Sequence, residues 1–193
     1  MKTLTFEEFS ALNPAWLGNK EQIKSYFDRF GGRMSALDIL NLDDVSAKDK
    51  LWAVLREEFI PAPILHEFAC VCAEYALSLV RYQDPRSIRA IEVKRAWLRD
   101  EATDEELYTA AGDAARAASA VADTAAWAAE VAWYATYGGA AYWAASNAAL
   151  YAAEAVYSAA KEAARDAFRE AQVVYLIMTL EEEKGKQSLT KNF

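Results

Sequence analysis

The sequence contains one histidine, His66, and two cysteines, Cys70 and Cys72. A single histidine excludes zinc motifs with two histidines and di-iron sites that take histidines from two helices. On a helix the two cysteines would lie about 200° apart around the axis, so they cannot form a disulfide with each other there. With no further cysteine available, the chain is typical of a reducing compartment, and we expect it to be cytoplasmic.

Proline is scarce, and the last of the four prolines is Pro85. Because proline ends or kinks a helix, the residues after Pro85 can form long helices. Glycine is scarce too, with seven in the chain. The pair Gly138–Gly139 marks either a turn between two long antiparallel helices or a close contact inside one longer helix. The turn is favoured, because two glycines inside a helix cost about 2 kcal/mol.

Motifs for catalysis and cofactor binding are missing from the chain. It has no GxGxxG, no phosphate-binding loop and no GxSxG. A catalytic triad would need His66, but the start of a hydrophobic helix favours a surface or capping role for this residue. We therefore expect a protein that is not an enzyme, with no catalytic residue, no metal site and no cofactor.

Dense charge of one sign is also missing. The net charge of −8 is spread along the chain, with acidic and basic side chains mixed. Without a basic arm, direct nucleic-acid binding is not expected. Residues 131–153 are uncharged over the length of a membrane span, but they are mostly alanine and include Ser146 and Asn147. Spanning helices depend on larger aliphatic side chains, so we expect a buried helix and no membrane insertion.

Alanine is abundant, making up 28 of the 58 residues in 110–167. Alanine is the strongest helix former, and its small side chain lets two helix axes approach closely. We therefore predict an all-α fold, in which long Ala-rich antiparallel helices form a multi-helix bundle over residues 61–183. A core helix at about 63–82 belongs to this bundle, and a frayed tail over 184–193 follows it.

Residues 1–60 have a different character and are expected to form a segment of short helices. Side chains that cap helix starts recur there, each followed three residues later by a suitable partner. The pairs are Thr5 with Glu8, Asn19 with Gln22, and Ser46 with Asp49. Gly31–Gly32 is predicted to end the second of these helices.

Large aromatic residues crowd both sides of the glycine pair and are the predicted partner-binding residues. They are Trp133, Tyr134, Tyr137, Tyr142 and Trp143. Tryptophan and tyrosine anchor many protein interfaces, which favours a binding patch. The alternative is that these rings fill gaps between alanine-faced helices.

Residues 50–170 resemble the immunity proteins of the Imm5-like family, which are helical, Ala-rich proteins of bacteria and their phages. The resemblance is carried by Leu65–Leu77, by Asp84-Pro85-Arg86-Ser87, by Ala96-Trp97-Leu98 and by the alanine repeats that follow. It implies an inhibitor that binds a toxin and blocks it without chemistry. No catalytic residue is implied by the resemblance.

Two hypotheses follow for the partner. The first is an immunity or antitoxin-type inhibitor that neutralises a toxin. The alternative is a phage-encoded inhibitor of a bacterial defence complex, of the anti-CRISPR or anti-restriction type, in which the first 50 residues supply the specificity. A homodimer is also compatible with the sequence, because close-packing alanine surfaces with aromatic rims can pair across a two-fold axis.

Overall fold

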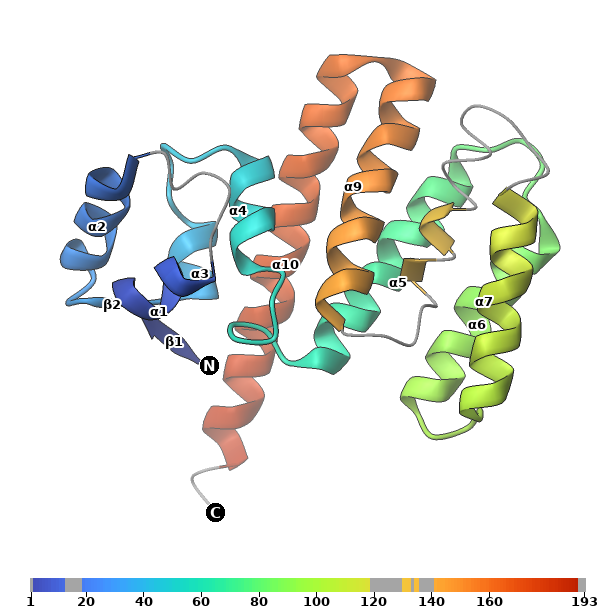
Figure 1. The fold of residues 1–193 in the computed structure, drawn as a ribbon, viewed down its shortest axis with the longest axis horizontal. Coiled ribbons are helices and arrows are strands. Elements are labelled where there is room, and N and C mark those ends of the chain that lie inside the picture. The colour runs from blue at the N-terminus through green and yellow to red at the C-terminus, as the bar shows by residue number, and fades with distance from the viewer. Residues whose placement is uncertain (1, 13–18, 119–129, 133, 136–140, 191–193) are drawn as a thin grey trace. The chain divides into compact units, whose positions relative to one another are not determined.

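The computed structural model describes residues 2–12, 19–118, 130–132, 134–135 and 141–190 (Figure 1). Helices dominate the described residues, which confirms the predicted all-α class. The chain divides into two compact units, one formed by Met1–Ile60 with Glu170–Phe193, and one by Pro61–Arg169. Gly138–Gly139 lies outside the described residues, so the prediction of a turn or a helix contact there stays a prediction.

The first unit contains short elements, which are β1 (Thr3–Thr5), α1 (Phe6–Ala11), α2 (Lys20–Arg29), β2 (Arg33–Ser35), α3 (Ala36–Leu40) and α4 (Ala47–Val54). The two strands pair antiparallel, with Leu4 opposite Met34. The sequence pattern does not predict them, because three residues are too few to show an alternating pattern. Each strand runs directly into a helix whose first residue follows the capping side chain.

The predicted capping residues begin the helices of this unit. Thr5, Asn19 and Ser46 each accept a hydrogen bond at 3.2 Å from the backbone N–H three residues later. The predicted end of α2 is confirmed as well. Gly31 and Gly32 have φ values of 70° and 86°, and the Gly32 N–H donates to the Phe27 carbonyl at 2.8 Å. This is a Schellman ending, which needs the left-handed backbone that glycine adopts without strain.

Aromatic rings form the core of the first unit. The ring of Phe9 lies 5.5 Å from that of Phe27 and 6.1 Å from that of Phe59, centre to centre. All three side chains are almost fully buried. Lys2 also joins distant segments, because its ammonium donates to the Glu57 carbonyl oxygen at 3.0 Å. Helices this short gain most of their stability from such packing.

The second unit contains α5 (Ala62–Ser78), α6 (Pro85–Leu98), α7 (Asp104–Ala118), α9 (Ala141–Ala160) and the beginning of α10 (Glu162–Thr190). α5 packs closely against α9 and also contacts α6, while α6 pairs with α7 (Figure 1). The predicted core helix is therefore α5, although it ends at Ser78 and not near residue 82. Pro63 lies in its first turn, as predicted.

Alanine fills the close contact between α5 and α9. On α5 the fully buried alanines are Ala69, Ala73 and Ala76; on α9 they are Ala145, Ala148, Ala152, Ala153 and Ala155. Because a methyl group adds little bulk, the two backbones can approach to about the short end of the usual 8–10 Å range. The alanine-rich sequence thus allows the two helices to pack closely.

The structure adds one break that the sequence analysis does not mark. The chain turns at Lys161, whose φ is 72°, and α10 begins at Glu162. Neither proline nor glycine marks this break, so the sequence pattern could not show it. α10 then runs to Thr190, into the segment for which the sequence predicts fraying.

Candidate functional site

Three of the five predicted partner-binding aromatics cannot be placed. Trp133, Tyr137 and the side chain of Tyr142 lie outside what the structure describes. Tyr134 is half-buried and stacks on Tyr151, with ring centres 4.8 Å apart and planes inclined by 16°. A hydrogen bond with Tyr151, followed by burial, raises the pKa of Tyr134 to about 12. This ring therefore packs within the second unit.

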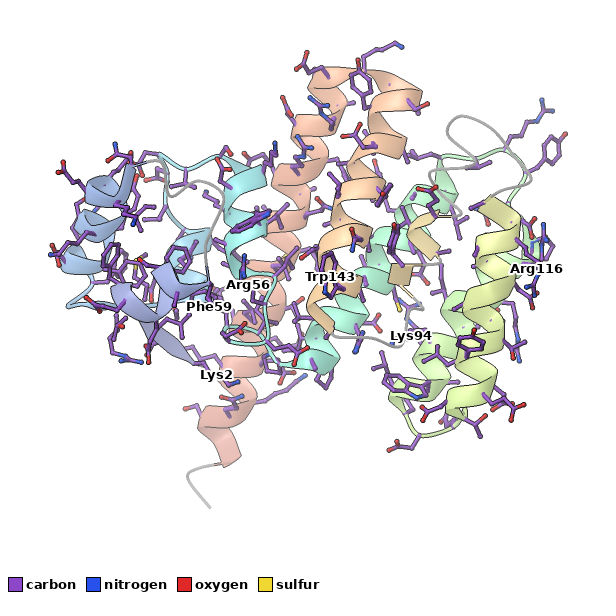
Figure 2. The ribbon with its side chains drawn as sticks, in the orientation of Figure 1. Lys2, Arg56, Phe59, Lys94, Arg116 and Trp143 are labelled. Atoms are coloured by element: carbon purple, nitrogen blue, oxygen red, sulfur yellow. The ribbon has the colours of Figure 1, made fainter. Side chains whose placement is uncertain are left out.

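Trp143 behaves differently and projects from α9 (Figure 2). It is 58% exposed, and two further large side chains of α9 are also exposed, Leu150 at 46% and Tyr157 at 42%. The three are spaced by seven residues, about two helical turns, so they lie along one face. We call these three residues the α9 stripe. Leu150 and Tyr157 were not among the predicted residues, although their spacing from Trp143 could have indicated them.

The helix that carries the α9 stripe has almost no charge of its own. Glu154 is the one charged residue in α9. Its carboxylate lies 3.8 Å from Arg165 and 3.8 Å from Arg169, both on α10. The Arg165 guanidinium also lies 4.9 Å from the centre of the Tyr157 ring. The stripe is therefore an apolar ridge that ends in an ion-pair cluster, in which Arg165 and Arg169 also pair with Glu162 and Asp166.

A second group of functional side chains is buried between α5 and α6. His66 is 6% exposed, and its ring meets that of Trp97 edge-on, with centres 5.8 Å apart. Lys94 is 0% exposed, and its ammonium lies 4.1 Å from the centre of the Trp97 ring. This corrects the expected surface or capping role of His66. The sequence missed Lys94 entirely, because a lysine inside a helical pattern usually lies on the solvated face.

Two polar atoms of this buried group lack hydrogen bonds within the described part of the chain. Neither the Lys94 ammonium nor His66 Nδ1 has a hydrogen-bond partner among the described residues. Burial lowers the pKa of Lys94 to about 8, and burial with the nearby Lys94 charge lowers the pKa of His66 to about 4. Burial also raises the pKa of the Cys70 thiol to about 12. At neutral pH the thiol and the imidazole are uncharged, so they do not form the thiolate–imidazolium pair of a cysteine nucleophile.

An ion-pair network lies at the rim of the same contact. Arg95 on α6 reaches two carboxylates of α5, donating to Glu67 at 2.7 Å and also pairing with Glu74. Hydrogen bonds to Glu74 and Glu67 raise the pKa of Arg95 above its ordinary value. α5 and α6 are thus joined by satisfied charges at the rim, whereas the ammonium inside lies on the Trp97 ring without a hydrogen bond to any described residue.

Two shallow depressions lie on the second unit. One, of about 470 Å³, is lined by residues of α5, α6 and the adjoining loops that include Glu74, Arg95 and Arg99. The other, of about 410 Å³, lies between α6 and α7 and has several acidic side chains, among them Glu101, Glu105 and Asp113. Neither is lined by His66, Cys70 or Lys94, so neither gives a ligand access to the buried group.

Within the described ranges, no three histidine, cysteine, aspartate or glutamate side chains come together as metal ligands would. Nor does any helix in the part of the chain that was searched combine the length and hydropathy of a membrane span. Searches among known protein families, curated proteins and solved structures find no match to this chain. The α9 stripe and the buried group are therefore the features of this chain that bear on its function.

Proposed function

We propose that this protein is a non-catalytic binding protein that attaches to another protein and neutralises it, using the α9 stripe as its contact surface. The observation that supports this is the exposure of Trp143, Leu150 and Tyr157 on one face of an otherwise well-buried helix. Large apolar side chains gathered on one surface often mark an interaction site. The immunity-type function implied by the resemblance fits such a surface, because inhibition by binding needs no reactive group.

The dimensions of the α9 stripe suit a protein partner. Trp143 and Tyr157 are fourteen positions apart, and at 1.5 Å per residue this is about 21 Å along the helix. Tryptophan and tyrosine contribute much of the binding energy at protein interfaces, because they bury large rings with few rotatable bonds. A ridge of this length and width would fit a groove on the partner surface.

The stripe serves both partner classes equally well, because an apolar ridge with no net charge selects by shape. If the captured partner is a toxin, this protein is an antitoxin-type inhibitor. If the partner is a defence complex of the CRISPR or restriction type, this protein is a phage-encoded inhibitor. The identity of the captured partner separates these two functions.

The test is a pull-down from lysate of the host strain, with the full-length tagged protein as bait. Three baits are compared: the wild type, Leu150→Arg in the stripe, and Ala159→Arg as the matched control. Ala159 is exposed on the same helix but points away from the stripe, so its variant controls for an added charge. We expect a partner that is retained by the wild type and the control and lost by Leu150→Arg.

Capture of one protein equally well by all three baits would contradict the proposed surface. Recovery of a ribonucleoprotein with its guide RNA would favour the defence complex and rule out the toxin. Turnover of a substrate by the purified protein, lost in His66→Ala, would contradict the non-catalytic function itself.

A further inference from the structure

The α9 stripe has an internal symmetry that its function as a binding ridge does not require. Leu150 lies midway between two aromatic residues, Trp143 seven positions before it and Tyr157 seven positions after it. A two-fold axis through Leu150 would place a second copy of α9 antiparallel to the first. Each Trp143 would then face Tyr157 of the other copy, and the two Leu150 side chains would meet. Offset aromatic pairs of this kind are favourable.

Charge also favours a second copy over a charged partner at this surface. Each chain carries a net charge of −8, but the stripe contributes none of it. The carboxylate of Glu154 lies 3.8 Å from Arg165 and from Arg169, so it does not repel its counterpart across the axis. Arg165 at the Tyr157 end would in addition approach Trp143 of the second copy, where a guanidinium can stack on the ring.

We propose that a second copy of this chain covers the α9 stripe in the resting protein, and that the neutralised partner displaces it. The inference rests on the proposed function, since the second copy would regulate partner binding at the same α9 stripe. Three side chains that are about half exposed bury less than the roughly 800 Å² per partner of a stable dimer. The dimer is therefore weak, and a tighter partner can replace it.

Engineered disulfides test the axis directly. With helix axes about 10 Å apart and Cα atoms about 2.3 Å from each axis, facing Cα atoms at the two-fold axis are about 5–6 Å apart. This lies within the range of a disulfide. Two copies of residue 157 would instead be about 21 Å apart along the helices. Full-length Leu150→Cys should give a disulfide-linked dimer under mild oxidation, whereas Tyr157→Cys alone should stay monomeric.

Two controls complete the cross-linking experiment. The wild type should not cross-link, because Cys70 and Cys72 are buried at 0% and 2% exposure. A mixture of Trp143→Cys and Tyr157→Cys should cross-link to each other, because these positions face across the axis. Equal cross-linking of Leu150→Cys and Tyr157→Cys would overturn the proposed pairing.

Sedimentation of the unmodified protein gives an independent readout. The wild type should show mass that rises with concentration, and Leu150→Arg should stay a monomer at every concentration. A wild type that remains monomeric at the highest concentration overturns the second copy, even if its stripe still captures a partner. The proposed function would survive that result.

Competition between the two occupants is the last step. We expect the oxidised Leu150→Cys dimer to lose capture of the partner found with the wild-type bait, and reduction to restore it. A locked dimer that captures this partner as well as the reduced protein does would overturn the displacement. Because the same sample is measured before and after reduction, misfolding of the variant cannot produce the expected result.

Discussion

Helix α5 has two contacts of opposite chemistry in the second unit. Where α5 packs closely against α9, both helices are rich in buried alanine. Toward α6 the contact holds His66, Lys94 and Trp97 inside, and Arg95 with its two glutamates at the rim. The first contact is rich in small side chains that let the helices pack closely. The second includes a buried charge that weakens it at neutral pH.

This difference determines which substitutions each contact tolerates. A contact made of methyl groups has no space for a larger side chain, because neighbouring atoms already touch. A contact that holds a buried ammonium without a hydrogen-bond partner among the described residues should improve when the charge is removed. Substitutions in the two contacts should therefore change stability in opposite directions.

The largest expected effect is on the alanine contact. Ala148 is fully buried on α9, and Ala148→Phe should lower the free energy of unfolding by about 3 kcal/mol, because the ring forces the helices apart. Urea denaturation followed by far-UV circular dichroism measures this. Ala159→Phe, on an exposed position of the same helix, is the control and should change stability by less than about 0.5 kcal/mol. Equal losses in both variants would contradict the close contact.

The next effect is in the opposite direction and concerns Lys94. Lys94→Met keeps an unbranched side chain on the Trp97 ring but removes the buried charge. We expect the free energy of unfolding at pH 7 to rise by about 2 kcal/mol. The fall of the Lys94 pKa from 10.5 to about 8 corresponds to about 3 kcal/mol at about 1.4 kcal/mol per unit, and loss of the ammonium–ring contact offsets part of it. Lys48→Met, at an exposed lysine, should leave it almost unchanged. A destabilised Lys94→Met would show that the ammonium is bound favourably after all.

Alkaline pH provides a second measurement on Lys94. Its pKa falls from the ordinary 10.5 to about 8 on folding, so below about pH 8 both folded and unfolded chains carry the charge and the full penalty is present. Between about 8 and 10.5 only the unfolded chain keeps the proton, so stability should rise with pH. Subtracting the profile of Lys94→Met removes the contribution of other groups. A difference that stays flat across this window would contradict the buried charge.

The sequence predicted the alanine contact far better than the polar one. Alanine repeats and the proline break before α5 indicate a close-packed helix directly, and capping pairs such as Ser46 with Asp49 locate helix starts. The buried group depends instead on the rotation of α5 and α6 about their axes. His66 and Cys70 share one face of α5, while Lys94 and Trp97 share one face of α6, but nothing in the sequence says that these faces meet.

The α9 stripe illustrates the same limit. Crowding of aromatics beside the glycine pair drew attention to this part of the chain, yet crowding does not separate buried rings from exposed ones. Tyr134 packs on Tyr151, whereas Trp143 is exposed. The turn at Lys161 was also beyond sequence reasoning, because a left-handed lysine costs energy that only tertiary packing can compensate.

A third, smaller effect should appear in acid. Burial lowers the pKa of His66 from 6.5 to about 4, so the folded chain resists protonation that the unfolded chain accepts. Stability should therefore fall as pH drops from about 6.5 to about 4, and this group adds no further loss below that. His66→Leu should remove its share of the slope, which is about 1 to 2 kcal/mol between about pH 6.5 and about pH 5. An identical slope in this variant would mean that His66 finds a proton-stabilising partner.

The smallest effect is expected at the rim of the polar contact. Arg95 is 29% exposed at its side chain, and Glu67 and Glu74 are 42% and 49% exposed, so water screens both pairs. Glu67→Gln should cost less than about 1 kcal/mol, and the loss should shrink in 1 M salt. Urea denaturation at low and high salt measures both. A loss that is larger than the gain from Lys94→Met and unaffected by salt would mean that the rim holds α5 to α6. Because the rim charges are solvated and the interior charge is not, the polar contact is instead expected to depend mainly on what lies on the Trp97 ring.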